Sequence, residues 1–393
     1  MKRWILLAVL LLPALSACGG STAGAPTSAP AAPAATSAPV ATADSSGGAA
    51  AAGDTVDRSK LAKELFFYNW SDYIDPQILT DFTKEYGVKV TMDTYTANED
   101  MIAKVRAGSS GYDMVIPSDY AVTTMAIEGL IIPLDKRLLS NVTHIDPNLL
   151  DQYFDKGNVY SVPYMYGISG IAYNKQDFPN GVDSWAALFD PAQIAKYKGK
   201  FSMLDDQRET PGAALKYLGK SLNDTDPADL KAAQELLIAQ KPFLASYNSS
   251  DVNRKLASHE YVIAHAWGGM AMQAHNGLGS DFSGNPDIMF AMPKEGGMIW
   301  MDNMAILKDS PNAYTAHVFM NYLMRPDVAA RNAEYIGYLL PNKDGVALLP
   351  QKIKDLYAAG FAPTAEMMKR LEWAVRNEKT NAFNDLWTVV KGE

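Results

Sequence analysis

Short apolar runs alternate with stretches of helical periodicity over most of the chain. Glu64–Trp70 predicts a strand, and apolar residues three and four positions apart between Pro76 and Tyr86 predict a helix. The further strands that the alternation predicts are Val88–Tyr95, Tyr112–Pro117, one that ends at Asp205 or Asp206, Glu260–Trp267 and Ile288–Pro293. Further helices are expected over residues 98–107, 228–240 and about 313–324. Strands and helices that alternate through short connections are typical of a parallel sheet covered by helices, so the pattern predicts an α/β fold.

The first residues of the chain do not share this pattern. A positive start with Lys2 and Arg3 is followed by the apolar stretch Trp4–Leu15 and by small residues that end in Cys18. These features are typical of a secretory signal peptide, and the small residues before the cysteine resemble a bacterial lipobox, whose cysteine is lipid-modified. We therefore expect a lipoprotein signal peptide over residues 1–17 and a lipid anchor on Cys18. A plain cleaved signal peptide and an uncleaved anchor are the alternatives.

The segment after the cysteine has the composition of a linker. Residues 19–54 are almost wholly Gly, Ala, Ser, Thr and Pro. Such a segment cannot bury apolar surface, so we expect residues 18–59 to be a flexible tether between the anchor and a folded body. No other run of about 18 apolar residues exists, so no further membrane span is expected. At 393 residues the chain exceeds the size at which one core keeps growing, which favours two lobes.

Charge and cysteine content restrict the class of protein. The formal net charge is −9, and removal of the two cations Lys2 and Arg3 lowers it to −11. An acidic surface argues against nucleic acid, whose binding needs clustered Lys and Arg, and is compatible with a cationic ligand. The single cysteine excludes a disulfide within the chain.

Enzyme motifs are missing from the sequence. There is no P-loop, no G-x-G-x-x-G and no G-x-S-x-G, and the five histidines form no H-E-x-x-H arrangement. We therefore expect no cofactor, no metal site and no enzymatic activity. A glycosidase that uses paired carboxylates is the remote enzymatic alternative.

Aromatic rings and carboxylates recur where the expected strands end. In open parallel sheets, ligands bind outside the carboxyl ends of the strands. The side chains at these ends are Trp70, Ser71, Asp72, Tyr73, Ser118, Asp119, Tyr120, Asp205, Asp206, Glu209, Trp267, Trp300 and Asp302. Carboxylates accept charge-assisted hydrogen bonds from ammonium groups. Aromatic faces attract the same cations by about 0.5–2 kcal/mol each, and flat rings cover methylenes at roughly 0.8 kcal/mol per buried CH₂. This inventory indicates a site for a linear ligand with amines at its ends and methylenes between them, which describes a polyamine.

A series of motifs resembles one family along nearly the whole folded chain. The motifs are "YNWSDYI", "YDMVIPSDY", "IPLDK", "SVPYMYGISGIAYN", "DSWAALF", "AHAWGGM", "PKEGGMIWMDNMAI", "LMRPDVAA" and "YIGYLLPN". In this order, from about residue 65 to about 373, they resemble the spermidine/putrescine-binding proteins of bacterial ABC importers. The resemblance implies a two-lobe, type II periplasmic-binding-protein fold with the ligand between the lobes. Each lobe would be a mainly parallel sheet flanked by helices, lobe one holding residues 60–169 and 301–348 and lobe two residues 170–300 and 349–393.

The resemblance also implies a set of ligand contacts. They are Trp70, Ser71, Asp72, Tyr73, Ser118, Tyr120, Asp206, Glu209, Ser249, Trp267, Trp300, Asp302 and Tyr338. Asp302 is the expected anchor of an ammonium group, whereas Asp205 is expected to be a structural turn residue. The implied partners are a small polyamine and an ABC transporter permease, with a monomeric protein held outside the cytoplasmic membrane through Cys18, in the periplasm or at the cell surface.

Several positions depart from the family pattern and leave the length of the ligand open. Asp119 lies where a small or neutral residue is expected. At the position of Ala374, directly after Trp373, some spermidine-binding members carry glutamine. At the position of Met270, some putrescine-binding members carry aspartate. A binder of another organic cation, such as a quaternary amine, and a sensory lipoprotein that presents ligand to a receptor are the alternatives.

Overall fold

The computed structural model describes residues 56–108, 110–375 and 379–392. The expected signal peptide, the lipid anchor on Cys18 and most of the expected tether lie outside the described residues. The end of the expected tether belongs to the folded body. There the Asp57 backbone N–H donates to Tyr314 Oη over 2.8 Å, and the Asp57 side chain caps the short 3-10 helix Arg58–Lys60. Within the described ranges, no helix combines the length and the apolar character that a membrane crossing requires.

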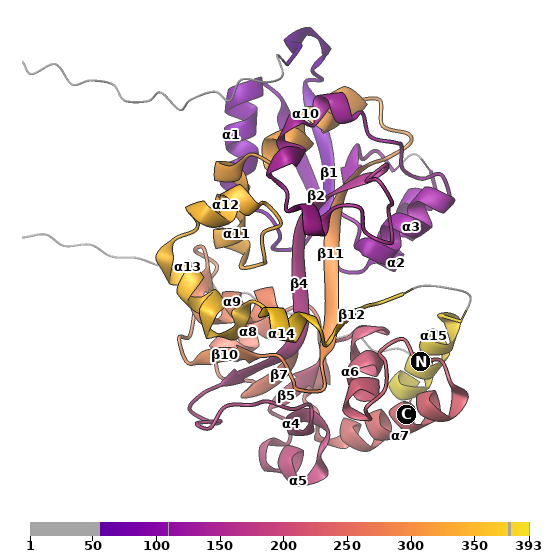
Figure 1. The fold of residues 1–393 in the computed structure, drawn as a ribbon, viewed down its shortest axis with the longest axis vertical. Helices are drawn as coiled ribbons and strands as arrows, with labels where there is room; N and C mark the ends of the chain where they lie inside the picture. Colours follow the sequence, from indigo (N-terminus) through magenta and orange to yellow (C-terminus); the bar gives the residue numbers. More distant parts are fainter. Residues whose placement is uncertain (1–55, 109, 376–378, 393) are drawn as a thin grey trace, which may run out of the picture. The chain divides into compact units, whose positions relative to one another are not determined.

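A ten-stranded sheet runs through the described part of the chain (Figure 1). Its strands follow the order β2-β1-β3-β11-β4-β7-β5-β6, with β10 beside β4 and β12 beside β11. Their bounds are β1 Glu64–Trp70, β2 Lys89–Tyr95, β3 Met114–Val115, β4 Ser161–Asn174, β5 Phe201–Met203, β6 Ser246–Tyr247, β7 Ile263–Trp267, β10 Ile288–Ala291, β11 Gly297–Ile306 and β12 Leu371–Trp373. A separate antiparallel pair consists of β8 Gly277–Leu278 and β9 Phe282–Ser283.

Parallel pairing dominates at the two sides of the sheet and antiparallel pairing at its centre. β1 is parallel to β2 and β3, and β5 is parallel to β6 and β7. The long strands β4 and β11 are antiparallel to each other, and their ladder shifts register between Asp302 and Asn303. Figure 1 shows both strands running the length of the sheet, so they connect the part that holds β1 and β2 with the part that holds β5 and β7.

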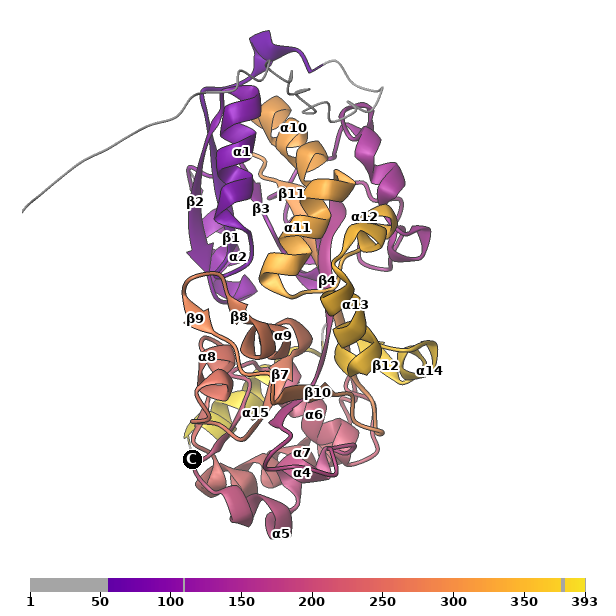
Figure 2. The ribbon, with the colours of Figure 1, turned by 90° about the vertical axis from the view of Figure 1, so that its left-hand side faces the viewer.

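Helices cover the sheet on both parts. Their bounds are α1 Pro76–Tyr86, α2 Asn98–Arg106, α3 Asp119–Ile127, α4 Ala186–Phe189, α5 Pro191–Ile194, α6 Glu209–Tyr217, α7 Pro227–Gln240, α8 Val252–Ala257, α9 Gly268–Asn276, α10 Ala313–Leu323, α11 Pro326–Ile336, α12 Lys343–Leu348, α13 Gln351–Leu356, α14 Ala365–Met368 and α15 Asn381–Gly392. Figure 2 shows α1, α10 and α11 beside β1 and β2, and α4, α6 and α7 in the part that holds β7.

Local sequence explains where α1 begins and ends. The Asp75 side chain accepts a hydrogen bond from the Gln77 backbone N–H, and Pro76 occupies the first helical turn. Gly87 ends the helix with a φ of 75°, a left-handed conformation that glycine adopts without steric cost. The buried face of α1 then joins the core of the β1–β2 part.

Among the described residues, the buried apolar side chains form five clusters, most of whose members fall into two groups along the sheet. The first group, which draws on residues 65–165 and 301–353, surrounds β1, β3 and one end of β4 and β11. The second group draws on residues 168–299 and 361–390 and surrounds β5, β7 and β10. Each group therefore combines segments that are far apart in the sequence, and the chain passes from one to the other within β4, within β11 and between residues 353 and 361.

Candidate functional site

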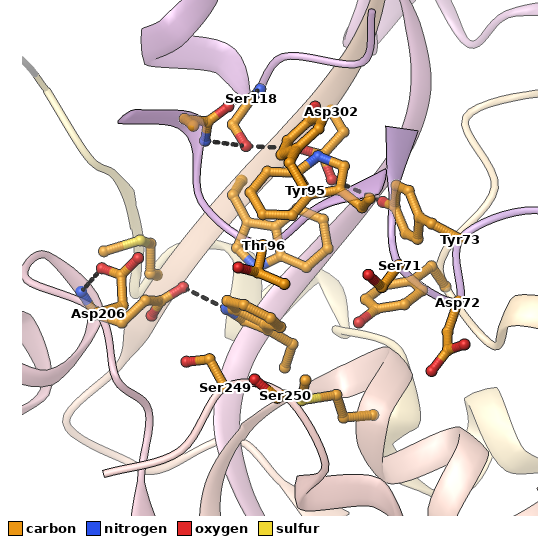
Figure 3. Close-up of a pocket in the computed structure, with 18 of the residues that line it drawn as sticks. Ser71, Asp72, Tyr73, Tyr95, Thr96, Ser118, Asp206, Ser249, Ser250 and Asp302 are labelled. Atoms are coloured by element: carbon orange, nitrogen blue, oxygen red, sulfur yellow. Dashed lines mark hydrogen bonds between the residues drawn. The ribbon is translucent and has the colours of Figure 1, made fainter. Parts of the chain in front are cut away.

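A cavity of about 190 Å³ lies beside the middle of β4 and β11 and is lined by side chains from both core groups (Figure 3). The structure brings together at this cavity every side chain expected as a ligand contact: Trp70, Ser71, Asp72, Tyr73, Ser118, Tyr120, Asp206, Glu209, Ser249, Trp267, Trp300, Asp302 and Tyr338. Their roles as ligand contacts stay predictions. The remaining lining residues were not among the expected contacts: Tyr95, Thr96, Asn98, Asp119, Arg208, Ser250, Asn253, Met270, Gln273, Met298 and Ala374.

Asp302 is a buried carboxylate that two hydroxyl groups hold in place. It lies on β11, directly before the register shift, with 5% of its surface exposed. Its Oδ2 accepts a hydrogen bond from Tyr73 Oη over 2.7 Å, and its Oδ1 accepts one from Ser118 Oγ over 2.6 Å. Burial raises the pKa of Asp302 to about 6, and the two hydrogen bonds oppose this rise. Each carboxylate oxygen keeps a further lone pair with which it can accept an ammonium N–H.

Asn98 positions the serine that holds Asp302. Its Nδ2 donates to Ser118 Oγ over 3.0 Å, and its Oδ1 accepts the Ser118 backbone N–H over 3.1 Å. The same amide nitrogen also donates to Tyr120 Oη over 2.9 Å. Asn98 and Tyr95 line the cavity but were not among the contacts expected from the sequence. Tyr95 ends β2 and Asn98 begins α2. Because ligands bind at the carboxyl ends of parallel strands, this position in the sequence could have identified both as candidate contacts.

A second acidic group lies at the beginning of α6. Asp206 Oδ1 accepts the backbone N–H groups of Arg208 and Glu209 over 2.7 and 2.9 Å. Burial, followed by the charge of Glu209, raises the pKa of Asp206 to about 6. Glu209 is itself buried, and its Oε1 accepts hydrogen bonds from Ser169 Oγ over 2.7 Å and from Trp267 Nε1 over 2.9 Å. These contacts fix the carboxylate of Glu209 against an indole ring of the cavity wall.

Aromatic rings form the walls between the acidic groups. The Trp70 indole, at the end of β1, donates from Nε1 to the Ile116 carbonyl over 2.9 Å. The Trp300 ring makes edge-to-face contacts with Trp267 and Tyr338, with centroid distances of 6.4 and 5.5 Å. Indole and phenol faces in this arrangement can cover methylenes and attract cations.

Two glycines make room for these rings. Gly167 on β4 pairs with Trp300 on β11, and a Cβ at position 167 would lie 2.2 Å from the indole. A Cβ at Gly269 would lie 2.4 Å from the Tyr338 ring. Since real Cβ atoms do not approach so closely, any larger residue at either position would displace an aromatic wall.

The rim of the cavity carries Asp72 in an ion pair. Asp72 adopts a left-handed backbone conformation with a φ of 54°. Its Oδ2 lies 3.1 Å from Arg254 Nη1, and Arg254 also contacts the Asp281 carboxylate. Figure 3 shows the Asp72 carboxylate pointing away from Asp302, and Ser249 and Ser250 across the cavity from Ser118. Asp205, expected to be structural, pairs with Lys391 and does not line the cavity.

Acidic side chains outnumber basic ones among the described residues that line the cavity. The acids are Asp72, Asp119, Asp206, Glu209 and Asp302, and the basic side chain is Arg208. The Arg208 guanidinium lies 3.8 Å from the centroid of the Phe383 ring and donates to Asn223 Oδ1 over 2.7 Å. Carboxylates flanked by aromatic faces in a buried cavity are suited to an organic cation.

Comparison with known proteins places this architecture in a family. A family model described as bacterial extracellular solute-binding protein matches residues 77–359. The chain belongs to this family.

Individual members of the solute-binding family are similar over most of the chain. The putrescine/cadaverine-binding protein of Pseudomonas aeruginosa is 36% identical over 342 residues, which cover 85% of this chain and 95% of the relative. The spermidine/putrescine-binding periplasmic protein of Escherichia coli is 39% identical over 331 residues, 83% of this chain and 90% of the relative. A solved structure titled as a putative spermidine/putrescine ABC transporter from Listeria monocytogenes is 37% identical, with a TM-score of 0.77 over 84% of this chain and 99% of that one. The expected resemblance and the expected α/β class, with a mostly parallel sheet flanked by helices, are confirmed.

Proposed function

We propose that this solute-binding protein captures a polyamine in the cavity and delivers it to the membrane permease of an ABC importer. The observation that carries the proposal is the presence of two acidic groups in one cavity. The buried carboxylate of Asp302 is one group, Asp206 with Glu209 is the other, and indole and phenol rings form the walls between them. The names of the relatives support the same ligand class, since those proteins bind putrescine, cadaverine or spermidine.

The contacts can be assigned by chemistry. Asp302 neutralises one terminal ammonium group of the ligand, and Asp206 with Glu209 neutralises the other. Trp70, Trp267 and Trp300 cover the methylenes between them. A micromolar dissociation constant needs about 8 kcal/mol net, which a few charge-assisted hydrogen bonds and buried methylenes supply after the costs of ordering the ligand.

Binding is proposed to close two lobes around the ligand. Lobe one holds residues 60–169 and 301–348, and lobe two holds residues 170–300 and 349–393. The two groups of buried side chains support this division, because each group draws on two separated segments of the chain, although Leu349 and Ile353 pack in the first group. Closure is driven by contacts that the ligand makes only in the closed state, and the strands β4 and β11 that pass between the lobes are the elements that bend.

The protein is proposed to work as a monomer outside the cytoplasmic membrane, tethered through a lipid on Cys18. The family consists of extracellular solute-binding proteins, which agrees with this location and with a role in transport rather than catalysis. The lipobox-like sequence before Cys18 and the linker that follows supply the attachment.

Tryptophan fluorescence provides a first test of the proposed ligand class. Since Trp70, Trp267 and Trp300 line the cavity, saturating spermidine or putrescine should change the emission of the protein in a concentration-dependent manner. Choline, a quaternary amine with a single positive charge, serves as the comparison. Saturable change with choline and none with either polyamine would replace the proposal by a quaternary-amine binder.

A further inference from the structure

Asp119 is a buried acid of the cavity that the expected contacts do not include. It is the first residue of α3, it lines the cavity, and 1% of its surface is exposed. Its Oδ1 accepts the Tyr120 backbone N–H over 2.6 Å. Its Oδ2 is buried and makes no hydrogen bond of regular geometry among the described residues, although the Met301 backbone N–H is close enough to lower the pKa of the carboxyl.

A structural role at the start of α3 does not account for this placement. A carboxylate in the first turn of a helix is favourable because of the helix dipole, but this benefit needs no burial. Burying a carboxylate oxygen without a donor costs free energy, which a neutral side chain at position 119 would avoid. A cationic N–H donor inside the cavity would offset that cost through a charge-assisted hydrogen bond.

Asp119 lies within electrostatic reach of both acidic groups of the cavity. Burial, together with the charges of Asp302 and Glu209, raises the pKa of Asp119 to about 8, and hydrogen bonds from the backbone N–H groups of Tyr120 and Met301 oppose this rise. Asp119 therefore interacts electrostatically with two carboxylates from separate elements, Asp302 on β11 and Glu209 on α6. If the two terminal ammonium groups of the ligand bind Asp302 and the Asp206–Glu209 group, and Asp72 stays paired with Arg254, Asp119 is the acid that remains for a third cationic centre.

We propose that Asp119 is a specificity-determining contact that binds the internal secondary ammonium of a triamine, so that the protein prefers a spermidine-type ligand to a diamine. This inference rests on the proposed function and deepens it by selecting the ligand within the polyamine class. A diamine has two cationic centres and leaves Asp119 without a charged partner. A triamine supplies one cation to each acidic position.

A pair of ligands matched in length tests the proposal. Spermidine and 1,8-diaminooctane have the same chain length, but a methylene replaces the internal nitrogen in the second compound. The wild-type protein should bind spermidine about tenfold or more tightly than 1,8-diaminooctane, because only spermidine places a cation against Asp119. Asp119→Asn keeps the size of the side chain and removes its charge. It should reduce the ratio of the two affinities at least about fivefold, because it removes the charged hydrogen bond that distinguishes the two ligands.

A charge-matched control separates local contact from the general field of the protein. Asp100 lies exposed on α2 and does not line the cavity, so Asp100→Asn removes one negative charge and should leave the ratio unchanged. A wild-type ratio near one, or a ratio that Asp119→Asn preserves, would overturn the role of Asp119 and leave polyamine binding standing. Binding of neither ligand by the wild-type protein would instead overturn the proposed function and this inference with it. If Asp119→Asn does not fold, the wild-type ratio by itself decides the preference.

Discussion

Asp72 and Arg254 form an ion pair, with 3.1 Å between Oδ2 and Nη1, that joins the turn after β1 to α8. The two residues are 182 positions apart in the sequence and belong to different proposed lobes. The pair therefore links the two proposed lobes at the rim of the cavity and leaves the Asp72 carboxylate engaged by a side chain of the protein itself.

Removing this link should weaken binding modestly. Both side chains are about one-third exposed, and partly exposed ion pairs contribute up to about 1 kcal/mol, so Arg254→Gln should weaken ligand binding by roughly two- to fivefold. The loss should appear as faster dissociation in stopped-flow measurements, because the pair would hold the two proposed lobes together in the proposed closed state. Asp72→Asn should have the same effect, and the double variant should add little. Arg106→Gln, which breaks the pair with Glu128 away from the cavity, is the matched control. Tighter binding by Arg254→Gln would mean that the arginine competes with the ligand for Asp72.

The carboxylate of Asp302 should dominate affinity. Asp302→Asn removes a buried charge from the cavity and should weaken binding by at least about tenfold, the usual size of one charge-assisted hydrogen bond. Tyr73→Phe and Ser118→Ala keep the charge and remove one supporting hydroxyl each, so their losses should be smaller. Calorimetric titration of the variants gives the comparison. An Asp302→Asn protein with nearly unchanged affinity would remove Asp302 as the anchor.

Binding should weaken as the solution becomes acidic. Burial raises the pKa of both Asp302 and Asp206 to about 6, so each is partly protonated in the free protein at that pH. An ammonium ligand favours the ionised carboxylates, and its binding therefore releases protons. The dissociation constant should rise by roughly tenfold or more as the pH falls from about 7.5 to about 5. Since the pKa of Asp119 is raised to about 8, the dissociation constant should also change, more weakly, with pH above neutrality. A dissociation constant independent of pH across this range would contradict the assignment of these acids to the ligand.

The space at Gly167 should be required for an intact aromatic wall. A methyl group at this position would lie 2.2 Å from the Trp300 ring, so Gly167→Ala should displace the indole and weaken binding by about tenfold, comparable to the loss of a buried aromatic contact. Trp300→Ala should weaken binding to a similar extent. In the Trp300→Ala background, Gly167→Ala should add little, because the ring that it displaces is already absent. Independent, additive losses in the double variant would show that Gly167 acts through another part of β4.

The sequence predicts local elements and strand ends well, for a physical reason. The bounds of β1 and α1 follow from an apolar run and from capping residues that act within a few positions, and both coincide with the structure. Contacts expected on separate strands meet at one cavity because the topology of the sheet brings strand ends together. The expected strand Tyr112–Pro117 shortens to Met114–Val115, since only this part finds partner strands.

Features that depend on distant partners could not be predicted from the sequence. β4 was not recognised as a strand, because its residues are buried along almost the whole run and lack a period of two. The need for glycine at position 167 depends on its pairing with Trp300, and the pairing of Asp72 depends on Arg254, 182 positions away. The end of the tether was placed too late because Asp57 is held by Tyr314, 257 positions away.

Isothermal titration calorimetry of the protein with putrescine, cadaverine, spermidine and spermine tests the central claim most directly. We expect a saturable heat for at least one polyamine, one ligand per protein, with a dissociation constant of about 1 μM or lower. Spermidine should bind most tightly if Asp119 acts as proposed. Choline should produce no comparable heat. An absence of heat with all the polyamines, or tighter binding of choline than of any of them, would contradict the assignment of the cavity to polyamines.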